Sequence, residues 1–278
     1  MIGPIPGGIT MTFNALAIDL DGTLLVGEDI PDANIMTLRA ARHAGYHVII
    51  ATARWVQMAE RVQAAVGLDG PIIACSGAQV FEPASRLDLL DTRLPSDFAA
   101  ELFALCNAER CVATLTLDDH VLVKMEGTPQ GPGVRPEMQF VPSLDFGAVE
   151  RVRVANIQGG RVYERIVSEL RPRFQASVNF YDSISPNGKT ILTITARAAS
   201  KGSALRHACA YLGVSPAAVV AFGDAENDID LFRAAGASVA MGQADAATRA
   251  AATWVTRRND EAGVADAITQ LLARGTLA

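Results

Sequence analysis

The chain has few lysines, few aromatic residues and no apolar run long enough to cross a membrane. Lysine supplies 3 of the 24 basic residues, and aromatic residues make up 6% of the 278 positions. Residues 1–12 lack the basic and apolar regions of a secretory signal, and no stretch approaches the roughly 20 apolar residues of a membrane helix. We expect a cytoplasmic protein with a disordered leader at 1–12, in which Met11 is an alternative start.

The cysteines and the modest charge exclude further classes of protein. The four cysteines form no CxxC pair and no zinc-ligand spacing, so we interpret them as buried thiols in a reducing compartment. A net charge of −6 argues against unspecific binding to nucleic acid or to an anionic membrane. Apolar residues make up 50% of the chain, which suffices for one large or two modest domains. Nothing in the sequence indicates the oligomeric state.

Short apolar runs alternate with helical patterns at both ends of the chain. Predicted strands at 15–20, 47–51 and 71–75 are separated by predicted helices at 32–44 and 54–66. After residue 195 the same rhythm returns, with helices at 200–212, 227–235 and 260–273 and strands at 217–222 and 238–241. This order predicts an α/β fold with a doubly wound, Rossmann-like parallel sheet. Ligands of such sheets bind at the carboxyl ends of the strands.

The middle of the chain follows a different pattern. Helices are predicted at 98–107 and 162–170, and strands at 112–117, 121–124, 152–157 and 177–181. Asn187-Gly188 is a strong hairpin signal. We therefore predict a catalytic core at 13–81 and 187–278, split by an inserted α+β cap domain at 82–186.

The segment DLDGTL, residues 19–24, follows the first predicted strand. Asp19 could attack a phosphorus atom and form an aspartyl phosphate. Asp21 could protonate the leaving alkoxide and then deprotonate the attacking water. Gly22 permits a tight turn whose backbone N–H groups can bind phosphate oxygens. A plain acidic turn remains an alternative, and a calcium loop is disfavoured because its glycine comes two positions later.

A second candidate segment, Thr52-Ala53-Arg54, follows the second predicted strand. A hydroxyl and free N–H groups at this place suit a phosphate oxygen, although a simple helix cap by Thr52 is equally compatible. In a third segment, Lys201 stands in the first turn of a helix, where the helix dipole disfavours a cation. Since lysine is rare in this chain, Lys201 is a candidate to neutralise Asp19 and a phosphate. An ordinary surface lysine is the alternative.

A fourth segment, GDAEND at 223–228, follows a predicted strand and is rich in oxygen ligands. Such a cluster suits Mg²⁺, which would offset the repulsion between an aspartate nucleophile and a phosphate dianion. Helix capping by Asp224 or Asn227 is the alternative, but capping requires only one such residue.

With these segments in this order, the chain resembles the haloacid dehalogenase-like superfamily of phosphatases. DLDGTL, SKGSAL and GDAEND carry the resemblance, and the branch it fits is the Cof-type branch with a large C2-type cap after the third core strand. The resemblance implies that Asp19 is the nucleophile, that Asp21 is the general acid and base, and that Thr52 binds phosphate. It implies that Lys201 bridges the phosphate to Asp19.

The same resemblance implies a Mg²⁺ cofactor. We assign the metal to Asp19, Asp21, Asp224 and Asp228, with Asp224 as the main ligand and Asp21 contributing its carbonyl. The phosphate-binding set is Gly22, Ala53, Arg54 and Asn227. Three positions depart from the family pattern: glycine is usual at Ala53, and asparagine is usual at Ser76 and common at Gln243.

The predicted function is a phosphatase that acts on a small phosphorylated metabolite, either a sugar phosphate or a phosphorylated cofactor. A phosphomutase is the nearest alternative, and a phospho-aspartate receiver is a third that lacks a role for Asp21. In a capped enzyme the cap selects the substrate. Four cap cations are candidates for this role, and the sequence does not rank them: Lys124, Arg135, Arg161 and Arg165.

Overall fold

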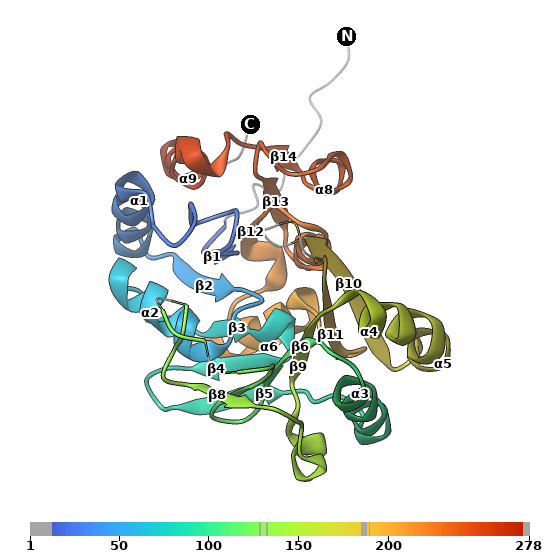
Figure 1. Cartoon of the computed structure of the whole chain (residues 1–278). Coiled ribbons are helices and arrows are strands. Elements are labelled where there is room, and N and C mark those ends of the chain that lie inside the picture. The colour runs from blue at the N-terminus through green and yellow to red at the C-terminus, as the bar shows by residue number, and fades with distance from the viewer. Residues whose placement is uncertain (1–12, 128, 132, 185–187, 189, 275–278) are drawn as a thin grey trace.

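The computed structural model describes residues 13–127, 129–131, 133–184, 188 and 190–274. Two sheets form separate parts of the protein (Figure 1). The leader 1–12 with Met11, and Asn187 of the predicted hairpin, lie outside the described residues. Within the described part, no helix is both long and apolar enough to cross a membrane.

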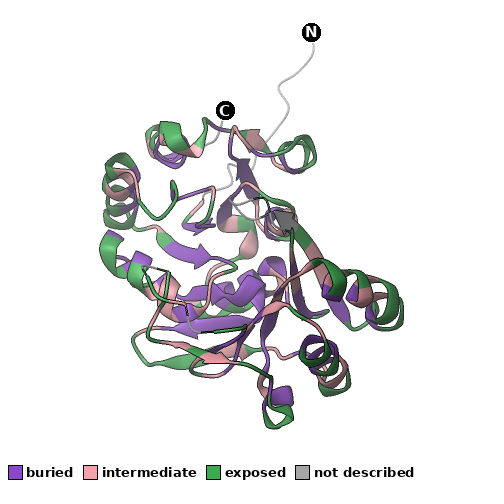
Figure 2. Cartoon of the chain, viewed as in Figure 1, coloured by how far each residue is buried: buried purple, intermediate pink, exposed green. Residues whose placement is uncertain are grey.

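The first sheet has eight strands in the order β14-β13-β12-β1-β2-β3-β4-β5. Its strands are β1 (Ala15–Ile18), β2 (His47–Ala51), β3 (Ile72–Ala74), β4 (Gln79–Glu82), β5 (Leu87–Asp91), β12 (Val219–Gly223), β13 (Ala237–Ala240) and β14 (Trp254–Val255). The pairs from β14 to β3 are parallel, and β4 and β5 add an antiparallel hairpin at one edge. The central strands are buried on both faces, as Figure 2 shows, which explains their continuous apolar runs.

Helices cover both faces of this sheet. They are α1 (Asp32–His43), α2 (Val56–Val66), α6 (Lys201–Leu212), α7 (Ile229–Ala234), α8 (Ala246–Ala251) and α9 (Gly263–Arg274). Residues of α1, α2 and α9 pack in one apolar cluster, and residues of α6 and α7 pack in another on the opposite face. The predicted doubly wound core is thereby confirmed. Short helical turns complete this part: η1 (Cys75–Gly77), η4 (Pro216–Ala218), η5 (Glu226–Asp228) and η6 (Asn259–Glu261).

The second sheet has six strands in the order β10-β11-β9-β6-β7-β8. Its elements are α3 (Ser96–Ala108), β6 (Val112–Thr116), β7 (Val121–Lys124), β8 (Met138–Val141), η2 (Phe146–Arg151), β9 (Val154–Gln158), α4 (Gly160–Arg165), η3 (Ile166–Leu170), α5 (Arg171–Phe174), β10 (Val178–Ile184) and β11 (Thr190–Ala196). Residues of α3, α4 and α5 pack with Leu115, Ile157 and Ile194 in one apolar cluster, on the side of the sheet away from α1 and α2 (Figure 1). Thr193 and Asn156, which alternate with those positions, hydrogen-bond each other at 2.8 Å.

The two sheets divide at other positions than the predicted domain boundaries 82 and 186. β5 pairs with β4 in the first sheet, and β11 pairs with β9 in the second. The cap therefore extends from α3 to the end of β11, and two linkers, 92–95 and 197–200, connect it to the core. The hairpin was missed because its antiparallel strands look like cap strands until their pairing is known.

The cysteine prediction is confirmed for three residues. Cys75, Cys106 and Cys209 are buried free thiols, whereas Cys111 is partly exposed.

Candidate active site

The four candidate segments meet at the carboxyl ends of three neighbouring strands. Asp19 follows β1, Thr52 follows β2, Asp224 follows β12, and Lys201 begins α6. The three strands are adjacent because β1 lies between β12 and β2. The order of strands therefore brings together residues that are more than 180 positions apart in sequence, as the pair Asp19 and Lys201 shows.

Lys201 is the buried cation of the site. Its side chain is 1% exposed, and Nζ donates at 2.6 Å to Oδ1 of Asp19 and at 2.6 Å to Oδ1 of Asp228. Ser200 caps the helix by accepting from the Ser203 N–H at 3.1 Å. Burial alone would lower the pKa of Lys201, but the two carboxylates outweigh burial and raise it. Lys201 is thus held as a cation between two carboxylates.

The carboxyl groups of Asp19 and Asp224 lie in an environment that disfavours their charge. Burial, with Asp228 and Asp224, raises the pKa of Asp19 well above its usual range, although Lys201 acts in the opposite direction. Burial, together with Asp228, raises the pKa of Asp224 to about 6. The single lysine does not compensate this group of acids, so a further cation would stabilise their ionised forms.

Oxygen atoms of Asp19, Asp224 and Asp228 all lie within 4.8 Å of one another. Asp228 is the most engaged of the three, since Oδ1 accepts from Lys201 and Oδ2 accepts from the N–H groups of Asp224 and Ala225. Among the described residues, the carboxylate of Asp224 accepts one long hydrogen bond, from the Thr23 hydroxyl at 3.4 Å. Asp19 and Asp224 are therefore better able to bind a metal than Asp228, which orients Lys201.

Asp21 is apart from this cluster. Its carboxylate is paired with Arg54 through both oxygens, at 2.6 Å and 2.9 Å, and Arg54 also bonds Glu28. Arginine commonly pairs with a carboxyl group through two such hydrogen bonds. The predicted acid and the predicted phosphate ligand Arg54 thus bind each other, an arrangement that the separate segments did not reveal.

The loop after β2 is held by its own backbone. Thr52 is fully buried, and its hydroxyl accepts from the N–H of Arg54 at 3.1 Å, which leaves the hydroxyl proton free to donate. The helix-cap alternative is wrong, because α2 begins at Val56 and Trp55 occupies its N-cap position. Ser76 donates its N–H to the Thr52 carbonyl at 3.0 Å. Ala53 is exposed beside them. Ser76 therefore supports the Thr52 loop through its backbone, so this contact does not depend on an asparagine side chain.

Two glycines allow close approaches at this site. Gly22 has φ +80°, and a Cβ there would collide with the Asp224 carboxylate. Gly77 has φ +92°, and a Cβ there would collide with the backbone of Ser200. Gln243, one of the departures from the family pattern, donates to the Gly22 carbonyl at 2.5 Å. It therefore braces the turn after Asp21, a role that sequence reasoning missed.

The remaining predicted residues lie at two different places. Asn227 lines a cleft of about 640 Å³ between β10 of the cap and α7 of the core, with Tyr181 and Arg197. Among the cap cations, Arg135 lines a pocket with Arg54 and Glu28. Lys124, Arg161 and Arg165 gather instead around Glu109, which follows α3. Since α3 begins directly after the first linker, its other end, with these three cations, lies away from that linker.

Comparison with known proteins gives one family. The model of the haloacid dehalogenase-like hydrolases matches residues 16–268. The chain is 29% identical to pyridoxal phosphate phosphatase YbhA of Escherichia coli, over 93% of this chain and 98% of that protein. It is 27% identical to 5-amino-6-(5-phospho-D-ribitylamino)uracil phosphatase YcsE of Bacillus subtilis, over 91% and 93%. It also matches 46% of the longer chloroplastic endoribonuclease YBEY of Arabidopsis thaliana, with 29% identity over 92% of this chain.

Solved structures share the whole fold. The sugar phosphatase BT4131, described as a member of HAD subclass IIB, superposes with a TM-score of 0.76 over 93% of this chain and 98% of that chain, at 22% identity. A haloacid dehalogenase-like hydrolase from Bacillus subtilis gives 0.77 over 93% and 99%, at 21% identity.

Proposed function

The chain belongs to the haloacid dehalogenase-like hydrolases, and we propose that it is a magnesium-dependent phosphatase of small phosphorylated metabolites. The observation that carries this proposal is the contact between Lys201 and Asp19, two oppositely charged side chains that are at most 7% exposed. Burying such a pair costs desolvation free energy and adds little net stability, so its presence favours a functional role. A desolvated carboxylate beside a fixed cation is suited to attack an anionic ester.

The chemistry we propose has two steps. An oxygen of Asp19 attacks phosphorus, the bond to the leaving oxygen breaks, and the product alcohol departs with a proton from Asp21. Water then attacks the aspartyl phosphate, gives its proton to Asp21, and releases inorganic phosphate and the Asp19 carboxylate. Lys201 keeps its proton throughout, because both of its carboxylate partners favour the charged form.

Mg²⁺ fits the acidic cluster. Its donors are hard carboxylate oxygens, and the raised pKa of Asp224 marks a carboxylate that lacks a compensating cation. Asp19 and Asp224 would hold the ion, with the Asp21 carbonyl as the third protein ligand that the family resemblance implies. When bound, it offsets the repulsion between Asp19 and the phosphate dianion.

Arg54 has a role of its own in this scheme. Because both oxygens of Asp21 accept from Arg54, the acid must leave this pair before it can protonate a leaving group. A substrate phosphate near Thr52 would compete with Asp21 for the same guanidinium. We propose that substrate binding thereby releases Asp21 for catalysis.

The relatives support a small phosphate ester as the substrate. Their names specify pyridoxal phosphate and a phosphorylated ribitylamino-uracil, and the fold neighbour is a sugar phosphatase. The cleft of about 640 Å³ beside Asn227 has room for a leaving group of that size.

The test is a phosphate-release screen with sugar phosphates, pyridoxal 5′-phosphate, flavin mononucleotide and nucleotides. We expect Mg²⁺-dependent release from at least one of them, and at least about a 10⁴-fold lower turnover in Asp19→Asn, because that variant lacks the nucleophile. Asp29→Asn, an exposed acid in the same loop region, is the matched control and should retain full turnover. Transfer of the phosphoryl group within a sugar, without release of phosphate, would instead indicate a mutase. Retained turnover in Asp19→Asn would exclude the proposed nucleophile.

A further inference from the structure

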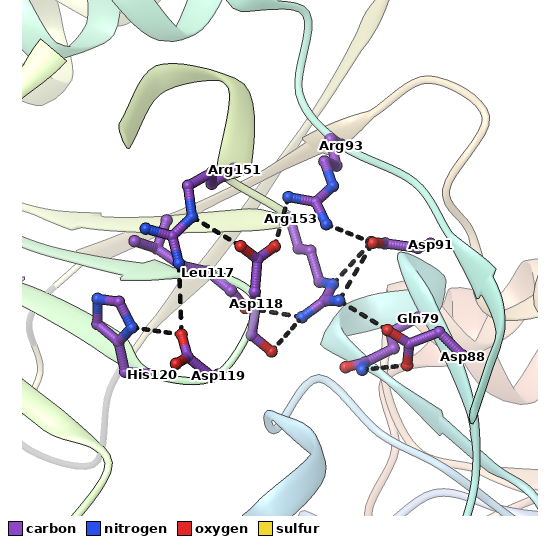
Figure 3. Close-up of polar contacts among 10 residues, drawn as sticks. All are labelled: Gln79, Asp88, Asp91, Arg93, Leu117, Asp118, Asp119, His120, Arg151 and Arg153. Atoms are coloured by element: carbon purple, nitrogen blue, oxygen red, sulfur yellow. Dashed lines mark hydrogen bonds and ion pairs between the residues drawn. The ribbon is translucent and has the colours of Figure 1, made fainter. Parts of the chain in front are cut away.

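A buried arginine of the cap, Arg153, joins three segments near the first linker (Figure 3). It precedes β9 and is 2% exposed. Nε donates to Asp91 at 2.7 Å, and the terminal nitrogens donate to Asp88 at 2.9 Å, to Asp91 at 3.2 Å, and to the carbonyls of Leu117 and Asp118 at 2.7 and 2.8 Å. Every nitrogen of the guanidinium therefore has an acceptor.

The acceptors belong to both parts of the protein. Asp88 and Asp91 stand on β5, the edge strand of the core sheet, whereas Leu117 and Asp118 stand in the turn between β6 and β7 of the cap. A buried guanidinium needs the compensating charge of its carboxylates. The cap can therefore rotate at this point only if it carries β5 along or leaves a buried charge without a partner.

The linker backbone is fastened on either side of Arg93. The N–H of Thr92 donates to the core carbonyl of Ala78 at 2.7 Å, and the N–H of Leu94 donates to the cap carbonyl of Val152 at 2.8 Å. Arg93 itself pairs at 2.5 Å with one carboxylate of each part. Hydrogen bonds therefore hold the linker on both sides of Arg93, which shares Asp91 with Arg153.

This network also reaches the phosphate-binding loop. Val154, the residue after Arg153, lies in the same apolar cluster as Cys75. Burial raises the pKa of the Cys75 thiol to about 12. Cys75 begins the η1 turn, and the next residue, Ser76, donates its N–H to the carbonyl of Thr52. The turn is therefore packed between the base of the cap and the end of β2.

We propose that Arg153 is a positioning residue that fixes the cap to the core and, through the η1 turn, holds Thr52 at the phosphate-binding end of β2. The anchoring of the cap follows from the contacts alone. The effect on Thr52 rests on the proposed phosphatase function. The anchoring of the cap and the effect on Thr52 therefore need separate measurements.

The experiment compares Arg153→Ala with Arg173→Ala, a control that removes a cap arginine from an exposed pair with Glu101. Hydrogen exchange of peptides covering residues 74–95 is measured without substrate. We expect the amides of Ser76 and Leu94 to exchange at least about tenfold faster in Arg153→Ala and unchanged in the control. For the best substrate of the screen, kcat/KM should fall about ten- to a hundredfold. KM should account for most of the fall, because Asp19 and Lys201 do not touch the network.

If Arg153→Ala does not fold, Asp91→Asn removes one charge from the cluster without changing its shape and is measured in the same way. If the Leu94 amide of a folded variant exchanges at the wild-type rate, Arg153 does not anchor the cap. Faster exchange with an unchanged KM would overturn the coupling to Thr52. Since exchange requires no turnover, absence of phosphatase activity in the wild type would count against the proposed function and leave the exchange result to decide on the anchor.

Discussion

The core and the cap each bury a lysine, and the partners of the two lysines differ. Lys201 of the core is held at 2.6 Å by two carboxylates. Lys124 of the cap is 7% exposed and donates to the carbonyl of Glu109 at 2.8 Å, with the sulfur of Cys111 at 3.7 Å. A buried cation such as Lys201, whose partners are carboxylates, is suited to a catalytic role. A buried cation such as Lys124, which is held by a backbone carbonyl, is suited to stabilising local structure.

The two sheets differ in a corresponding way. The core sheet is covered on both faces, so its polar groups collect where strands end, and they converge on one point. The cap sheet has its apolar cluster on one face, and two of its buried polar residues, Arg153 and Asn179, form hydrogen bonds near the two linkers. We therefore assign the proposed catalysis to the core, and we assign Arg153 and Asn179 to the attachment of the cap.

Removal of metal should have the largest effect, and only on the core. We expect chelation with EDTA to lower turnover at least about a thousandfold and Mg²⁺ to restore it, because the ion offsets the charge of Asp19 and the phosphate. Turnover is measured on protein shown to be metal-free by elemental analysis. Hydrogen exchange in α3 of the cap should stay unchanged. Full turnover without metal would contradict the assignment of Asp19 and Asp224 as ligands.

Substitution of each lysine by methionine tests the comparison between core and cap directly. Lys201→Met should lower kcat at least about a hundredfold, since it removes the fixed cation beside Asp19. Lys124→Met, the matched change in the cap, should leave kcat within about threefold, because its partners take no part in the reaction. Both are measured by phosphate release, with circular dichroism to verify folding. Equal losses in the two variants would break the distinction between core and cap.

A smaller effect is expected in the pH dependence of stability without metal. Folding raises the pKa of Asp19 and of Asp224, the latter to about 6, so the folded state binds these protons more tightly than the unfolded state. Proton binding by these two residues therefore increases the free energy of unfolding at low pH. This contribution is lost as the pH rises through the raised pKa values. We expect Tm to fall by on the order of 5 °C between about pH 5 and about pH 7.5.

The carboxyl groups beside Arg93 and Arg153 differ from these acids, because their pKa values are lowered. Asp91 and Asp118 lie partly buried beside arginines that lower their pKa, so both are already ionised at about pH 5 and add no slope above it. Differential scanning calorimetry of the chelated protein checks the prediction. Asp224→Asn should flatten the curve, and Mg²⁺ should raise Tm most at the higher pH. A Tm that rises with pH would exclude the assigned cause.

The sequence predicted the core well because its signals are local. A strand that is buried on both faces reads as an apolar run, and the polar group after it marks the carboxyl end, so Asp19, Thr52 and Asp224 could be placed before any pairing was known. The grouping of these residues then follows from the order of the strands. Their catalytic roles and the metal ligands stay predictions.

The missed features depend on contacts between distant segments. Nothing local indicates that β4 and β5 extend the core sheet, or that Arg54 pairs with Asp21. Arg153 had a weak signal, a charge between Val152 and Val154 in the predicted strand 152–157, which indicates a partner but does not identify it. The cap cations likewise could be ranked only from the fold, because the sequence does not show that Arg135 lies near Arg54 and that Lys124 lies near Glu109.

The η1 turn touches both linkers of the cap. Ala78 accepts from Thr92 of the first linker, and Gly77 leaves room for Ser200 at the end of the second. A chimera that grafts a relative's cap onto this core should therefore splice at about 96 and 196 and retain residues 75–78 with the recipient. A splice within residues 75–78 would combine a relative's linker contacts with the Thr52 loop of this chain. The grafted cap would then be misplaced relative to Thr52, even if both domains folded.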